Sequence, residues 1–242
     1  GVSGGTVALI LGIYERLVHA ISCFDLTFLG HLRKRELIAA LRHIDALFLV
    51  TLFLGIGIGV IGLGGLMHYL LEHQLQYTFG AFFGLILASS WHVARIIDHW
   101  NAKLVVCMVI GAVGAFFLVA LPVFKSPPDT AWYRLICGGV AICAMILPGI
   151  SGAFILLILG QYSEITGALE EVKNGGANGD TWLILGAFGL GATIGILSFS
   201  KFLKWLLARF ESATMAVLCG FMLGSLRKIW PFKFDLTPGE TK

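Results

Sequence analysis

Charged residues are scarce in this chain. Asp, Glu, Lys and Arg make up 13% of its 242 residues, about half the share found in soluble domains. So few charges cannot coat a soluble globule of this size, and a hydrophobic content of 57% excludes intrinsic disorder. The formal net charge of +3 is too small to imply a nucleic-acid partner. The composition therefore predicts a protein that uses lipid as its solvent.

Motifs for metal binding and catalysis are missing as well. The five cysteines are odd in number and show no C-x-x-C spacing, so neither a disulfide framework nor a zinc site is expected. We interpret them as small buried hydrophobic residues. The sequence contains no H-E-x-x-H and no Walker motif. We therefore expect a protein that is not an enzyme and that holds no resident cofactor or metal.

Long apolar runs dominate the chain, and about 20 apolar residues suffice for a helix to cross a bilayer. An all-α polytopic membrane protein is therefore predicted. Two further apolar stretches, 1–22 and 132–169, carry glycine-rich motifs, and the second is interrupted by Leu147-Pro148-Gly149-Ile150-Ser151-Gly152. The candidate transmembrane segments are 46–71, 78–97, 104–124, 182–207 and 212–226.

The two motif-bearing stretches resemble each other. GVSGGTVALILGIYERLVHAI (1–21) and GISGAFILLILGQYSEITGAL (149–169) share nine of 21 positions at an offset of 148. A weaker match at an offset of 136 places Gly55, Gly59 and Thr78 on Gly191, Gly195 and Thr214. The difference of 12 residues lies in a polar insert, 22–45. We infer a duplication with a first repeat at 1–131 and a second at 132–242.

The second motif follows an apolar stretch, 132–148. The repeat predicts a counterpart of this stretch before Gly1 in the natural protein, ending in proline. We interpret each motif as the tip of a re-entrant hairpin that enters and leaves the membrane on one side. This topology makes the repeats inverted with respect to the membrane, as in many secondary transporters.

Basic residues give the orientation. With re-entrant hairpins, ten Lys and Arg residues lie on the side of Arg16 and three on the other, which marks the first side as cytoplasmic. One continuous span over 132–169 would weaken this bias. Within the insert, apolar residues of 31–45 recur near helical spacing. This stretch is either an amphipathic helix with its bases on anionic headgroups or a simple stop-transfer charge cluster.

The interrupted motifs are candidate anion sites. Pro148-Gly149 must break a helix, and the half-helix that follows would present unpaired N–H groups to an anion. Two such ends, one per repeat, would suit a phosphate, whereas close helix packing through small residues is the alternative. Arg95 is a candidate for bidentate phosphate pairing, and Arg134 for an interfacial anchor. Glycines allow close backbone approach at Gly1, Gly4, Gly5, Gly149 and Gly152, and hydroxyl donors stand at Ser3, Thr6 and Ser151.

These motifs carry a resemblance. GVSGGTVALILGIYERL together with ILPGISGAFILLILGQY resembles the bacterial polyprenyl-phosphate transporter family (PopT), formerly a domain of unknown function, over essentially the whole chain. The resemblance implies return of undecaprenyl phosphate from the outer to the inner leaflet of the bacterial cytoplasmic membrane, which recycles the lipid carrier for peptidoglycan and other envelope polymers. It further implies a headgroup site lined by Gly1, Ser3, Gly4, Gly5, Thr6, Gly149, Ser151 and Gly152, and surrounded by Tyr14, Glu15, Arg16, Gln161 and Tyr162.

Two other functions stay open at this point. Membrane-embedded undecaprenyl-diphosphate phosphatases carry a similar motif, but Gly152 and Ala153 stand where that family has Arg and Ser. An ion or small-solute channel would show no dependence on a long lipid tail. The expected partners are the polyprenyl-phosphate lipid and membrane lipids, with homo-oligomer formation undecided. A proton or sodium gradient could drive transport, with Glu15, Glu164 or a histidine carrying the proton.

Overall fold

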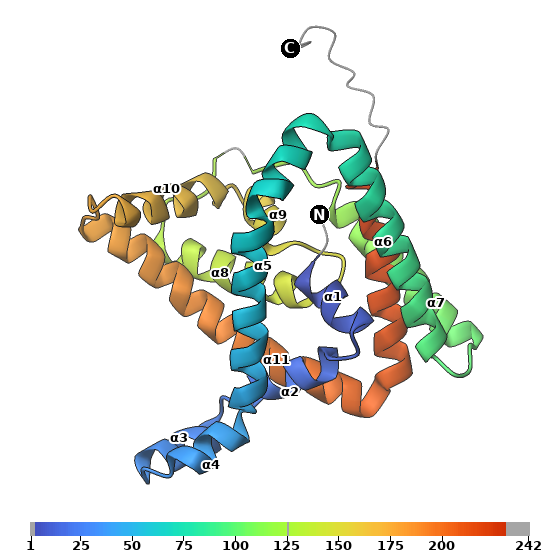
Figure 1. Cartoon of the computed structure of the whole chain (residues 1–242), viewed down its shortest axis with the longest axis horizontal. Helices are drawn as coiled ribbons and strands as arrows, with labels where there is room; N and C mark the ends of the chain where they lie inside the picture. The colour runs from blue at the N-terminus through green and yellow to red at the C-terminus, as the bar shows by residue number, and fades with distance from the viewer. Residues whose placement is uncertain (1–2, 125, 231–242) are drawn as a thin grey trace, which may run out of the picture.

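The computed structural model describes residues 3–124 and 126–230, and within them the chain forms helices and connecting turns without strands. The predicted all-α fold class is therefore confirmed. Figure 1 shows the helices in chain order. They are α1 (Gly4–Ile10), α2 (Tyr14–Ser22), α3 (Leu26–Arg33), α4 (Leu37–His43), α5 (Ala46–His73), α6 (Leu75–Ile96), α7 (Ala102–Leu118), α8 (Ala131–Ile146), α9 (Gly152–Ile158), α10 (Tyr162–Lys173) and α11 (Gly179–Ser225).

Three of the described helices, α5, α6 and α11, are long and apolar enough to cross a membrane. α9 and α10 are joined at an angle of 114° and would form a fourth, broken span or a re-entrant segment. α7 and α8 are apolar but shorter, and α7 ends at Leu118 although the apolar run continues to residue 124. The two predicted spans 182–207 and 212–226 both lie in α11, on either side of Phe210, whose non-helical backbone separates two helical segments.

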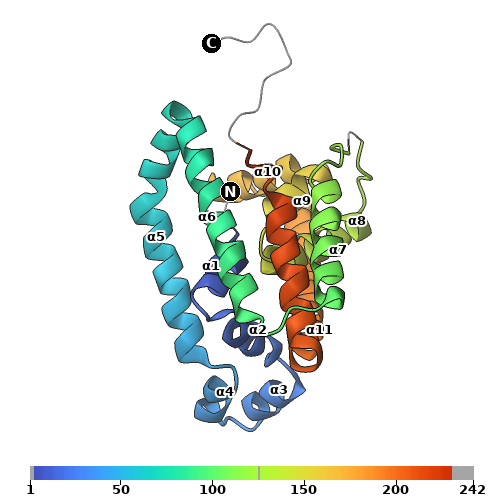
Figure 2. The ribbon, with the colours of Figure 1, turned by 90° about the vertical axis from the view of Figure 1, so that its right-hand side faces the viewer.

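The packed centre of the molecule lies around α11. α7 and α8 both pack along this helix, and Figure 2 shows α7 and α11 side by side. The main hydrophobic core joins residues of α2, α6 and α11, including Val18, Val93, Leu218 and Met222. The turn at Pro148-Gly149 brings α9 back onto α8, where Gly152 lies so close that an added Cβ would be 2.7 Å from the carbonyl oxygen of Ala141. This turn positions the second motif.

Equivalent positions of the two repeats have the same local structure. Gln74 (φ −135°, ψ 42°) separates α5 from α6, and its equivalent Phe210 (φ −138°, ψ 47°) forms the kink of α11. Thr78 donates to the carbonyls of Leu70 and Gln74, as Thr214 does to those of Leu206 and Phe210. These positions share a backbone geometry and a hydrogen-bond pattern, whereas the duplication and the inverted orientation of the repeats stay predictions.

The polar insert forms two short helices, α3 and α4, that project from the bundle (Figure 1). The expectation of a single amphipathic helix over 31–45 is wrong. Arg35 has a left-handed backbone (φ 59°), which ends one helix and redirects the chain. Because α4 leads within two residues into the apolar helix α5, the insert lies at the end of a membrane span.

Candidate functional site

The two motif copies contact each other directly. Ser3, the N-cap of α1, accepts a hydrogen bond from the Gly5 amide (3.3 Å) and donates its hydroxyl to the Leu147 carbonyl (3.3 Å). The Gly149 amide in turn donates to the hydroxyl oxygen of Thr6 (3.0 Å), and Thr6 is fully buried. The structure therefore brings the tips of both repeats to one place.

The backbone of α1 lies against the end of α8. A Cβ on Gly5 would overlap the carbonyl oxygen of Ile146 and lie 3.2 Å from the nitrogen of Pro148. The same Ile146 carbonyl accepts a hydrogen bond from the buried hydroxyl of Tyr14 (3.3 Å). Gly5 is consequently a contact residue between the tips, and no side chain larger than hydrogen fits there.

A cavity of about 190 Å³ lies beside the second tip. Ser151 borders it, and the hydroxyl of this N-cap residue caps no amide of α9. Lys228, in the turn after α11, also lines the cavity, and its ammonium nitrogen lies 3.4 Å from the centre of the Phe154 ring. Further lining residues are Phe79, Ile86, Val119, Gly149, Ile150, Ser225 and Ile229. One cation, one hydroxyl donor and apolar walls therefore meet in one small space.

The two tips differ in what they expose. In the first, the hydroxyl of Ser3 is engaged by Gly5 and Leu147, so the start of α1 is closed by contacts within the protein. In the second, Gly149 and Ser151 border the cavity. Both α1 and α9 have only seven residues, so their dipoles add little to anion binding. The cavity, and not a pair of helix ends, is therefore the candidate headgroup site.

The other expected site residues do not line this cavity. Arg16 is exposed and pairs with Asp45 (2.6 Å), which lowers the pKa of that carboxyl, and Arg95 lies exposed over the ring of Trp91. Glu15 and Tyr162 are exposed, and the buried Gln161 has a side-chain oxygen without a hydrogen-bond partner in the described part of the chain. Gly4 faces open space. Gly1 lies outside the described residues.

Lys228 is a candidate site residue that the sequence interpretation missed, because it follows the apolar segment 212–226 and resembles a charge of the C-terminal tail. Comparison of the two repeats could have identified Lys228 from the sequence. At an offset of 136, Ser225 and Lys228 correspond to Ser89 and His92. Each pair places a buried serine three residues before a basic side chain.

A buried ion pair fixes α10 to α8. Arg134, whose side chain is 9% exposed, donates from its Nε to the Oε1 of Glu164 (2.9 Å) and also pairs with Asp129. Arg134, which the sequence suggested as an interfacial anchor, thus binds two carboxylates with its guanidinium. At the offset of 148, the residue of the first repeat that corresponds to Glu164 is Arg16. Arg16 pairs with Asp45 in an exposed position.

This contrast gives a prediction. Glu164→Gln should destabilise the protein by about 2–3 kcal/mol, or lower Tm by about 5–10 °C, because it leaves the Arg134 guanidinium buried with only one carboxylate. Asp45→Asn removes an exposed pair that water screens, and should change Tm little. Thermal unfolding of both variants in the same detergent measures the difference. Equal Tm values would contradict a structural role for the buried pair.

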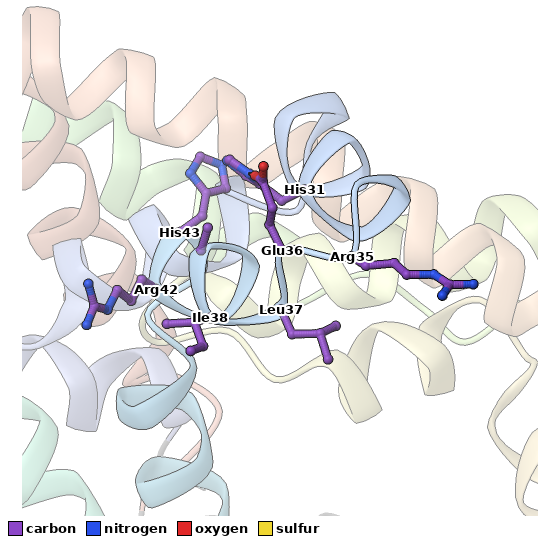
Figure 3. A pocket seen from close by; sticks show the side chains of 8 residues that line it. His31, Arg35, Glu36, Leu37, Ile38, Arg42 and His43 are labelled. Carbon is purple, nitrogen blue, oxygen red and sulfur yellow. The ribbon is translucent and has the colours of Figure 1, made fainter.

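A hollow of about 930 Å³ belongs to the insert and not to the motifs. Figure 3 shows His31, Glu36 and His43 gathered in its middle, whereas Arg35 and Arg42 point away to opposite sides. His31 lies 2.8 Å from Glu36 and His43 lies 3.2 Å from Asp25. The hydrogen bond from His31 lowers the pKa of Glu36. Because this open hollow has no residue of either motif, it is not a candidate headgroup site.

Comparison with known proteins gives consistent results. A family model described as undecaprenyl phosphate translocase-like matches residues 1–240. A polyprenyl-phosphate transporter from Vibrio cholerae is 42% identical over 237 residues, which are 98% of this chain and 74% of that protein. A polyprenyl-phosphate transporter from Staphylococcus aureus is 29% identical over 195 residues, 76% of this chain and 68% of that protein. No solved structure matches the chain.

Proposed function

Because this chain belongs to the undecaprenyl phosphate translocase-like family, we propose that it carries polyprenyl phosphate between the leaflets of a membrane. The cavity beside the second motif supports this function most directly. It combines the ammonium of Lys228 and the hydroxyl of Ser151 with apolar walls. A lipid with a phosphate headgroup and a long hydrocarbon tail has matching chemistry.

The headgroup binds in this cavity, within reach of Lys228 and Ser151. A phosphate monoester carries a charge of about −1.5 to −2 at neutral pH, and a charge-assisted hydrogen bond to Lys228 compensates part of its desolvation. Ser151 donates a further hydrogen bond. The apolar side chains of Phe79, Val119 and Phe154 border the same space and contact the first units of the tail.

Transport requires the headgroup to pass the closed contact between the two tips. Rocking of one repeat against the other separates Ser3 from Leu147 and Thr6 from Gly149 and opens the site toward the second leaflet. In the cell, the direction is from the outer to the inner leaflet of the bacterial cytoplasmic membrane, so that the lipid carrier is recycled for envelope synthesis. A proton or sodium gradient supplies the driving force.

Reconstitution into liposomes tests this function. We expect purified protein to move the headgroup of undecaprenyl phosphate from the outer to the inner leaflet, faster than in protein-free liposomes and without release of inorganic phosphate. Undecaprenyl diphosphate serves as the second substrate. Phosphate released from the diphosphate would show a phosphatase and overturn the proposal. Movement of a short water-soluble phosphate ester at the same rate would show a channel that ignores the tail.

A further inference from the structure

Helix α5 carries an uncovered glycine face. Gly55 and Gly59, one helical turn apart, lie on the same side of α5, and a Cβ added to either would meet nothing within 4 Å. Among the 28 residues of this helix only Phe48 and Leu49, near its start, are buried. Figure 2 shows α5 at the edge of the molecule. We call Gly55 and Gly59 the α5 glycine face.

The second repeat shows what such a face contacts. Gly191 and Gly195 of α11 are the equivalents of Gly55 and Gly59 at the offset of 136. A Cβ on Gly191 would overlap the carbonyl oxygen of Leu135, and one on Gly195 would lie 2.7 Å from the Cα of Gly139. Helix α8 therefore crosses α11 backbone against backbone at these glycines.

The partner helix contributes small residues to this crossing. A Cβ on Gly139 would lie 3.3 Å from the Gly191 carbonyl oxygen, and one on Gly138 would lie 3.0 Å from the amide nitrogen of Ala192. In lipid, where no hydrophobic effect drives helices together, such close backbone packing is a main source of helix association. The same pair of glycines on α5 is thus shaped for the same kind of contact.

The order of the elements along the chain indicates which segment covers the α5 glycine face. α8 runs directly into the second motif at Gly149, and the equivalent of Gly149 in the first repeat is Gly1. We propose that the α5 glycine face is covered by an apolar helix equivalent to α8 that leads into Gly1 and carries small residues where it crosses α5. Both relatives contain residues beyond the matched part, since the match covers 74% and 68% of their lengths.

This inference rests on the equivalence of the repeats and not on the transported substrate. That equivalence is carried by the shared backbone geometry of Gln74 and Phe210 and by the threonines four residues after them. If the protein failed to move polyprenyl phosphate, this result would not contradict the proposed helix contact. Conversely, a lipid-facing α5 would leave the transport proposal standing.

Nitroxide labels on the full natural protein test the contact. In a background without native cysteines, Ile56→Cys and Ile58→Cys form a matched pair. Ile56 is equivalent to Ala192, which lies against α8, whereas Ile58 is equivalent to Ile194, which is 51% exposed. The collision rate with oxygen dissolved in the lipid should be about threefold lower at position 56, because a packed helix face leaves no room for it. Equal and high rates would overturn the proposal.

A second pair of variants does not depend on labels. Gly55→Leu should lower Tm of the full protein by about 5 °C, because the added side chain separates two helix backbones. Gly57→Leu, whose equivalent Thr193 is exposed, should leave Tm near the wild-type value.

The distance between nitroxide labels at position 56 of two protein copies shows whether the helix that covers the α5 glycine face belongs to the same chain or to a second copy. A short distance between two protein copies would assign the face to a dimer and overturn the proposal.

Discussion

Gly5→Ala is expected to abolish headgroup transport and to lower Tm by several degrees, whereas Gly4→Ala should leave both near the wild-type level. A Cβ on Gly5 overlaps the carbonyl oxygen of Ile146, and that of its neighbour Gly4 meets nothing within 4 Å. α1 cannot shift to relieve the overlap without breaking the hydrogen bonds of Ser3 and Thr6 to the second tip. Overpacking of this kind costs about 1–3 kcal/mol.

The pair is matched because both changes convert glycine to alanine in the first turn of the same helix and raise its helix propensity equally. Initial rates of headgroup movement in liposomes, together with Tm in detergent, measure the two effects. If Gly4→Ala and Gly5→Ala behaved alike, the close approach of α1 to Ile146 would not occur in the working protein.

Lys228→Gln should reduce the rate of headgroup movement about 10- to 100-fold, because a hydrogen bond to a charged group contributes about 1.5–3 kcal/mol. Arg227→Gln is the control. It removes the same charge one residue earlier, but Arg227 is exposed and its guanidinium lies over the ring of Phe116. The control should keep most of the activity, and both variants should keep Tm within a few degrees of wild type.

The measurement is the initial rate as a function of the density of polyprenyl phosphate in the membrane. A loss that is overcome at high lipid density indicates weaker binding of the headgroup, as expected for an ammonium that contacts phosphate. Equal losses for Lys228→Gln and Arg227→Gln would instead indicate a general effect of surface charge, and the cavity would lose its assignment.

Sequence reasoning located the elements that local chemistry dictates. Pro148 and Gly149 must end a helix, and the Ser-Gly pairs favour helix starts, so the turn of the second motif and the starts of α1 and α9 were predictable. Long apolar runs gave α5 and α6 within a few residues. The shared letters G-x-S-G could not show, however, that one tip is closed by Ser3 while the other borders a cavity. That difference depends on which helix packs against each tip.

Other features depend on contacts that no local pattern encodes. Arg35 has a left-handed backbone, although this conformation is usually found at glycine or asparagine, and it divides the insert into α3 and α4. Lys228 gains its place from the turn after α11, which brings it to Phe154 from the second motif. Tertiary packing decided each of these outcomes.

The contact between the two tips also has an electrical consequence. Hydroxyl and amide groups of Ser3, Thr6, Tyr14 and Gly149 make direct hydrogen bonds across it, and Thr6 has no exposed surface. A hydrated ion has no place in a junction packed this closely, because an unpaired charge inside a medium of low dielectric constant is strongly disfavoured. Opening this junction for a lipid headgroup therefore requires that the hydrogen bonds of Ser3, Thr6 and Tyr14 are broken together.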